Sequence, residues 1–202
     1  SDVIVIHEQE RRVNVAFVLH TADGEFTAEA SVDVGRQGVF KDIVGSLGYE
    51  GKGALEIQAD LPITVISRAY CETDSGTFGT FFFGHRASEC LGRRSEVRLL
   101  ALRQEAGKFR TNINVTNTGA ETGIVKITLY RTDGRELVSY RVEVEPGMVV
   151  QDLQPFKNRA GEPNVGWGFA TVRVGNSRTT MLVSATVIDS RTNDPAIVTV
   201  VR

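Results

Sequence analysis

The chain contains an internal repeat, and this repeat constrains its fold more than any other feature. When residues 1–43 are shifted forward by 110 positions, without a gap, nine of them fall on identical residues. The matched pairs are Val5 with Val115, Val15 with Val125, Leu19 with Leu129, Asp23 with Asp133, Gly24 with Gly134, Val32 with Val142, Val34 with Val144, Val39 with Val149 and Asp42 with Asp152. A repeat of this period predicts two copies of one domain-sized module.

The repeat divides the 202 residues into two predicted domains, residues 1–87 and residues 88–202, with a boundary near Ser88. Residues 96–103 resemble a strand and precede the second copy, whereas no such segment precedes Ser1. We therefore expect the first domain to lack its first strand, and we expect the sequence to start inside a larger precursor.

Charge and hydropathy exclude two kinds of partner. The 23 basic and 25 acidic residues are mixed along the chain, which argues against a surface for nucleic acid. No apolar run approaches the roughly 20 residues that a membrane-spanning helix needs. We therefore expect a globular chain with no membrane span.

The pattern of short apolar runs predicts an all-β fold. Runs of five to eight residues rich in valine, isoleucine, threonine and phenylalanine are separated by turn residues. In the second copy, apolar and polar residues alternate over 113–116 and 125–129, which is typical of an antiparallel sheet with one buried face. Asp23-Gly24 and Asp133-Gly134 predict tight hairpin turns. The sequence thus favours two tandem antiparallel β-sandwich domains.

One short motif suggests a hydrolase. Asp74, Ser75, Gly76 and Thr77 match the local signature of half of an aspartic protease, whose chemistry needs a second carboxylate from a related lobe. The aligned stretch of the second copy, residues 191–194, has no such motif. We therefore interpret Asp74 as a turn residue and predict that the chain has no catalytic residues.

The histidines and cysteines offer few ligands for a metal. His7, His20 and His85 are the only imidazoles, and no third ligand lies at suitable spacing. We predict neither a metal nor a cofactor. Cys71 and Cys90 could form a disulfide, or each could be a free thiol, and the sequence leaves both alternatives open.

Trp167 is the candidate aromatic residue for a ligand. It lies between two glycines, and with Tyr130 or Tyr140 it could stack on a sugar ring. A tryptophan in this setting more often packs where two backbones approach closely. Carbohydrate binding is therefore the less favoured reading of this residue.

Comparison of the two copies also predicts an interaction face. The outward residues of the first two strands in the second copy are polar: Asn114, Thr116, Lys126 and Thr128. Their counterparts in the first copy are apolar: Ile4, Ile6, Ala16 and Val18. Because contiguous exposed apolar surface marks interaction sites, we expect this face to be covered by the second domain, by an upstream segment or by another molecule. We favour a contact within the chain or with a second copy in a homodimer.

Several segments resemble a known class of module. Residues 53–57, 67–70, 76–79, 100–104, 109–112, 185–189 and 194–195 are similar to the tandem immunoglobulin-like β-sandwich modules near the C-terminal ends of large secreted bacterial proteins. The resemblance implies a secreted or cell-surface location and a non-catalytic accessory, spacer or protein-interaction role beside neighbouring domains of one precursor. The alternative function is a carbohydrate or surface-ligand binding module, and a hydrolase is a weaker third reading.

Overall fold

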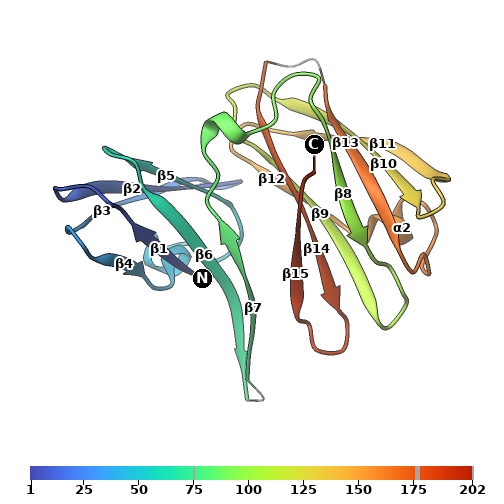
Figure 1. Cartoon of the computed structure of the whole chain (residues 1–202), viewed down its shortest axis with the longest axis horizontal. Coiled ribbons are helices and arrows are strands. Elements are labelled where there is room, and N and C mark those ends of the chain that lie inside the picture. The colour runs from blue at the N-terminus through green and yellow to red at the C-terminus, as the bar shows by residue number, and fades with distance from the viewer. Residues whose placement is uncertain (75, 176–177, 202) are drawn as a thin grey trace. The chain divides into compact units, whose positions relative to one another are not determined.

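The chain is all-β and divides into two compact units. A computed structural model describes residues 1–74, 76–175 and 178–201 (Figure 1). Unit 1 comprises Ser1–His85 and unit 2 comprises Arg86–Arg202. The sequence predicts a domain boundary near Ser88, and in the structure the boundary along the chain falls between His85 and Arg86.

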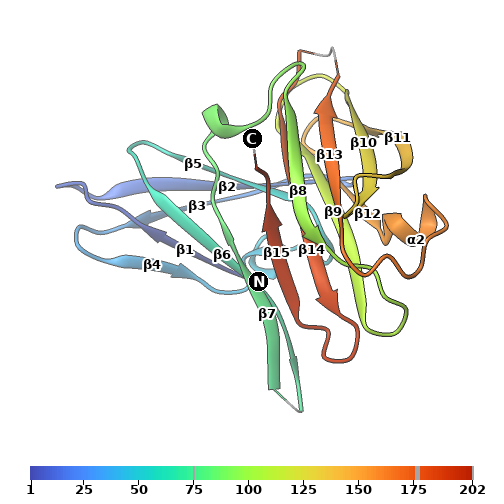
Figure 2. The same cartoon turned by 45° about the vertical axis from the view of Figure 1, so that its right-hand side comes forward.

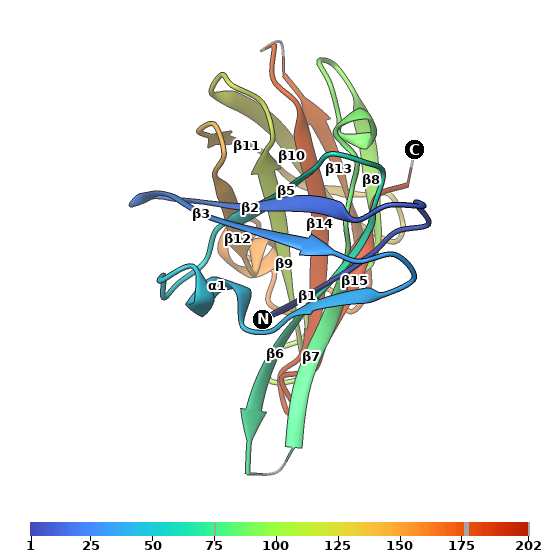
Figure 3. The same cartoon turned by 90° about the vertical axis from the view of Figure 1, so that its left-hand side faces the viewer.

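Unit 1 is a sandwich of two antiparallel sheets, which Figure 3 shows as separate layers. One sheet has the strand order β4-β1-β6-β7 and the other has the order β3-β2-β5. The elements are β1 (Asp2–Ile6), β2 (Val13–Thr21), β3 (Gly24–Val32), β4 (Gln37–Phe40), α1 (Ile43–Ser46), β5 (Ala54–Ala59), β6 (Thr64–Thr73) and β7 (Gly76–Phe83). Val3 and Val5 of β1 pack with Val15, Phe17 and Leu19 of β2 in one buried core.

Unit 2 is a second sandwich with its own core, and Figure 2 shows its two sheets. Their strand orders are β11-β10-β13-β8 and β12-β9-β14-β15. The elements are η1 (Ala87–Glu89), β8 (Glu96–Leu102), β9 (Phe109–Asn117), β10 (Gly123–Arg131), β11 (Glu136–Val144), β12 (Val149–Leu153), α2 (Pro155–Asn158), β13 (Gly168–Val174), β14 (Met181–Asp189) and β15 (Pro195–Thr199). Ile113, Ile127 and Leu129 are fully buried between the sheets.

The strands of the two units follow the same order, apart from β8. The order β4-β1-β6-β7 in unit 1 corresponds to β12-β9-β14-β15 in unit 2. The glycine just before β5 and the glycine that opens β13 also lie against equivalent neighbours. A Cβ atom on Gly53 would collide with the carbonyl oxygen of His20, and one on Gly168 would lie 2.6 Å from that of Tyr130. His20 and Tyr130 are themselves 110 residues apart.

Both predicted hairpins are confirmed. β2 and β3 pair up to Thr21 and Gly24, and β10 and β11 pair up to Tyr130 and Glu136. Gly24 and Gly134 have φ angles of 122° and 85°, which only glycine adopts readily. Among the described residues, no helix is long and apolar enough to cross a membrane.

Candidate functional site

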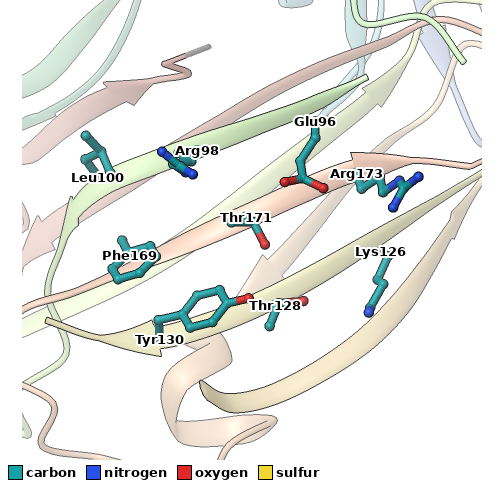
Figure 4. Close-up of a pocket in the computed structure, with 9 residues that line it drawn as sticks. All are labelled: Glu96, Arg98, Leu100, Lys126, Thr128, Tyr130, Phe169, Thr171 and Arg173. Carbon is teal, nitrogen blue, oxygen red and sulfur yellow. The ribbon is translucent and has the colours of Figure 1, made fainter. Parts of the chain in front are cut away.

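The outer face of the sheet β11-β10-β13-β8 contains a shallow depression of about 490 Å³. Figure 4 shows the nine residues that line it, which come from β8, β10 and β13. Strand register arranges them in rows across the sheet. The lining residues are Glu96, Arg98, Leu100, Lys126, Thr128, Tyr130, Phe169, Thr171 and Arg173.

The rows differ in chemistry. Lys126 pairs with Arg173, and Arg141 of β11 extends this basic row. In the next row Thr128 lies between Thr171 and Ser139, and its hydroxyl is 3.0 Å from that of Ser139. On β8, Glu96 lies opposite Arg173 at the end of the basic row, and Arg98 lies opposite Thr171 in the next row. A ligand on this face would therefore meet cations in both rows, hydroxyl groups in the second row and the carboxylate of Glu96 beside Arg173.

The third row is aromatic. The rings of Tyr130 and Phe169 are stacked with centroids 4.7 Å apart and an interplanar angle of 9°. Leu100 of β8 lies beyond Phe169 along the sheet and is 42% exposed. Because the rings are stacked, one face of each ring is covered by the other ring. A ligand can therefore contact only the opposite face or the edge of each ring.

Trp167 does not line this depression. Its side chain is half exposed, and the guanidinium carbon of Arg103 lies 4.7 Å from its ring centroid. Arg103 also lies 3.6 Å from the ring centroid of Phe109 and forms a 2.5 Å ion pair with Glu105. The hydrogen bond from Arg103 lowers the pKa of the Glu105 carboxyl. Trp167 is thus part of an aromatic and charged cluster near the end of β8.

The four residues predicted as one interaction face do not form one surface, and this prediction is wrong. Ile4 and Ile6 lie on β1, whereas Ala16 and Val18 lie on β2. These strands belong to different sheets whose inner faces share the core, so their outer faces point in opposite directions. Alternation along a strand distinguishes inside from outside, but it does not say which sheet the strand joins.

The outer face of β2 differs from the outer face of β1 in character. Val18 is buried, and its cross-strand neighbours are Thr27 and Glu56. His20 lies between two carboxylates, with its ring nitrogens 3.0 Å from Glu25 and 3.0 Å from Glu56. Hydrogen bonds from Gln58 and then from His20 lower the pKa of the Glu56 carboxyl. This face is polar and acidic.

Ile4 and Ile6 instead belong to an apolar outer face on the sheet β4-β1-β6-β7. We call this surface the apolar face and define it by Ile4, Ile6, Val39, Ile66, Phe81 and Phe83. Strand register aligns Val39, Ile4, Ile66 and Phe83 in a single row across the sheet. The exposed fractions of Ile6, Val39, Phe81 and Phe83 are 47%, 50%, 53% and 68%.

Polar groups border the apolar face. The guanidinium of Arg68 lies 4.6 Å from the ring centroid of Tyr70 and 5.9 Å from that of Phe81. The Tyr70 hydroxyl donates a hydrogen bond to the carboxylate of Asp2. The backbone N–H of Asp42 donates to the same carboxylate and is the main cause of its lowered pKa.

The remaining candidate residues, His7, Asp74 and His85, do not form a common site. His7 is buried, and its Nε2 lies 3.0 Å from the carbonyl oxygen of Val32, while its Nδ1 accepts the N–H of Gln9. Asp74 is exposed at the tip of the β6–β7 hairpin, and Ser75 lies outside the described residues. His85 is exposed at the end of unit 1. Within the described ranges, no group of three or more His, Cys, Asp or Glu residues could hold a metal ion.

Both cysteines are free thiols in this structure. Cys71 is exposed on β6, and its sulfur lies 3.9 Å from the carbonyl oxygen of Glu72. Cys90 is half-buried, and its sulfur lies 3.8 Å from the carbonyl oxygen of Arg86. The sequence leaves open a disulfide or two free thiols, and in the structure both cysteines are free thiols.

Unit 2 contains a buried polar group around Asp152 whose partners the sequence does not predict. Asp152 is 7% exposed, accepts a 2.6 Å hydrogen bond from the Tyr140 hydroxyl and forms an ion pair with Arg159. Burial, followed by the hydrogen bond to Asp152, raises the pKa of Tyr140. The hydrogen bond from Tyr140 to Asp152 joins β11 of one sheet to β12 of the other. We therefore assign this group a structural role, which is to stabilise the sandwich of unit 2. The repeat singles out Asp152 but gives no sign of Tyr140 or Arg159 as its partners.

Comparison with protein-family models, curated proteins and solved structures finds no match to this chain. Function is therefore inferred from the two surfaces themselves.

Proposed function

We propose that the chain is a non-catalytic protein-interaction module, an accessory part of a larger secreted bacterial protein that contacts another protein surface through the apolar face. The resemblance to tandem immunoglobulin-like modules supports the secreted and accessory parts of this proposal. The chemistry of the apolar face supports the interaction.

The observation that carries the proposal is a contrast between the two units. In unit 1 the row across the outer face is apolar and comprises Val39, Ile4, Ile66 and Phe83. In unit 2 the corresponding row is polar and comprises Gln151, Asn114, Ser184 and Thr199. The sandwich therefore does not require apolar residues at these positions, and exposed apolar surface of this kind marks an interaction site.

Burial of this row would give a useful binding energy. Each large side chain that passes from half-exposed to buried contributes roughly 1 to 2 kcal/mol. Arg68 and Tyr70 would form part of a polar rim around the apolar centre, which is the usual anatomy of a protein interface. The simplest partner is a second copy of the chain.

The test is a double substitution, Ile6→Lys with Phe83→Glu. Both side chains are exposed, so unit 1 should stay folded by circular dichroism. We expect the unmodified chain to self-associate as its concentration rises in sedimentation velocity, and the double variant to remain monomeric. The matched control, Thr27→Lys with Gln58→Glu, puts the same charges on the outer face of the other sheet and should associate normally. Identical sedimentation of the unmodified chain and the double variant would contradict the proposal.

A second candidate function follows from the depression in unit 2. Arg98, Lys126 and Arg173 line it beside the hydroxyl of Thr171 and the ring of Phe169. Cations, hydroxyl groups and an aromatic surface together suit a sugar polymer that bears carboxylates, because each kind of group has a partner on such a chain.

This second function predicts binding that depends on charge. Calorimetry should detect a polyuronate but not a neutral glucan, and the affinity should fall as salt is added. Arg173→Ala should weaken binding, while Arg191→Ala, at the tip of the β14–β15 hairpin, should not. Equal binding of the charged and neutral polymers would exclude the basic row as the recognition element.

A further inference from the structure

The sheet β3-β2-β5 has an open edge where the equivalent sheet of unit 2 has another strand. In unit 2, β13 pairs with β10 on one side and with β8 on the other. In unit 1, β5 pairs with β2 in the same register, since Leu55 lies opposite Leu19 as Ala170 lies opposite Leu129. Within residues 1–74 and 76–85, no strand pairs with the other edge of β5.

The core of unit 1 is less completely covered on this side. In unit 2, Val97 and Leu99 of β8 are 2% and 0% exposed, and the adjacent Ala170 and Val172 of β13 are both 0% exposed. In unit 1, the counterparts on β5 are only half-buried, as are three apolar side chains that follow in the chain. These residues are Leu55, Ile57, Leu61, Ile63 and Val65. A strand in the position of β8 would cover them.

The orientation of the β5 backbone suits such a strand. The N–H of Asp60 donates to the carbonyl of Asn14, so by alternation the N–H groups of Leu55, Ile57 and Ala59 point away from β2. In unit 2, the N–H of Val174, which corresponds to Ala59, donates to the carbonyl of Ser95 just before β8. β5 contains no proline, no lysine and no bulge, which are the usual devices that protect an edge.

We propose that the edge of β5 is an acceptor for an extended strand of a different protein, not of a second copy of this chain, with aliphatic side chains at alternate positions. The incoming strand takes the position that β8 holds in unit 2, pairs with β5 and places two aliphatic side chains over Leu55 and Ile57. Its backbone supplies the hydrogen bonds and its alternate residues supply the selectivity, as in recognition by strand addition. The acceptor edge lies on the sheet that does not carry the apolar face, so it is independent of the function proposed above.

The experiment uses the 202-residue chain and a synthetic peptide with the sequence of residues 95–103, which includes β8. We expect the peptide to bind and to slow amide hydrogen exchange in β5 by roughly tenfold or more, because the edge amides become hydrogen-bonded. The control peptide carries Val97→Ser and Leu99→Ser and should give no protection. Protection of β13 instead of β5 would show that the peptide only displaces β8, and it would overturn the proposal.

A pair of chain variants tests the edge itself. Ala59→Pro removes one edge N–H at an exposed strand end, where proline is tolerated, and should weaken peptide binding about fivefold or more. Gln58→Ala alters the neighbouring residue without removing an edge N–H and should bind normally. Circular dichroism confirms that both variants fold. Equal affinity of the two variants, or protection of β5 by a second copy of the chain without peptide, would contradict the proposed occupant.

Discussion

Among single residues, His7 and Asn117 show how one position of the repeat can keep its role while its chemistry changes. Asn117 donates to the carbonyl of Val144 and accepts the N–H of Gly119 through its side chain. His7 makes similar contacts with Gln9 and with Val32, which ends β3 as Val144 ends β11. The histidine therefore joins the end of β3 to the turn after β1, and this position does not need an imidazole.

This equivalence predicts different costs for two substitutions of His7. His7→Asn keeps one donor and one acceptor, so it should cost less than about 1 kcal/mol of the free energy of unfolding. His7→Ala leaves a buried carbonyl without its partner and should cost about 1 to 3 kcal/mol. Urea denaturation of both variants measures the difference. Equal losses would show that the hydrogen bonds of His7 do not stabilise unit 1.

Tyr140 predicts a dependence on alkaline pH. Its pKa in the folded state is raised above the ordinary value of 10.0, mainly by burial and then by its hydrogen bond to Asp152. A raised pKa contributes stability that is complete below pH 10 and is lost as the pH rises further, because only the unfolded state releases the proton easily. We expect unit 2 to lose stability above pH 10 and Tyr140→Phe to lose less over the same range. The two denaturation series should converge with rising pH, and parallel series would contradict this role.

At the scale of elements, the sequence predicts the strands and hairpins but not how the strands combine. Alternation identifies Val3 and Val5 as inward, and the Asp-Gly pairs mark the turns, because these signals are local. The assignment of β1 and β2 to opposite sheets depends on contacts between distant segments. The sequence therefore places Ile4 with Val18, whereas the structure places Ile4 beside Val39 and Ile66. The aromatic strand β7 contributes Phe83 to the same row, and no local signal links it to β1.

The close approach of β13 to β10 predicts the effect of a single methyl group. A Cβ atom on Gly168 would lie 2.6 Å from the carbonyl oxygen of Tyr130 and 3.0 Å from the ring of Phe156. Gly168→Ala should therefore destabilise unit 2 by about 1 to 3 kcal/mol. Gly92→Ala is the control, because a Cβ atom there meets nothing within 4 Å. The measurement is the midpoint temperature of thermal unfolding for both variants. Equal midpoints would mean that β13 shifts away from β10 at little cost in free energy.

For the whole molecule, the division into two units predicts where a protease cuts first. Residues 84–89 are exposed and lie between β7 and β8. Exposed backbone of this kind is where limited proteolysis concentrates. We expect early cleavage between about residues 84 and 94, and two fragments with strand-rich circular dichroism. Early cleavage inside β2 or β10 would contradict the assignment of these strands to stable sandwich cores.

The claim that the apolar face contacts protein is tested most directly by photo-cross-linking. The photoreactive analogue of phenylalanine, benzoylphenylalanine, replaces Phe83 in the apolar face, and in a control protein it replaces Thr27, which is exposed on the outer face of the other sheet. After irradiation of the concentrated chain, the Phe83 probe should give covalent dimers in high yield, because it is buried against a partner surface. The Thr27 probe should leave monomers. Equal yields from the two positions, or monomers alone from both, would contradict the account.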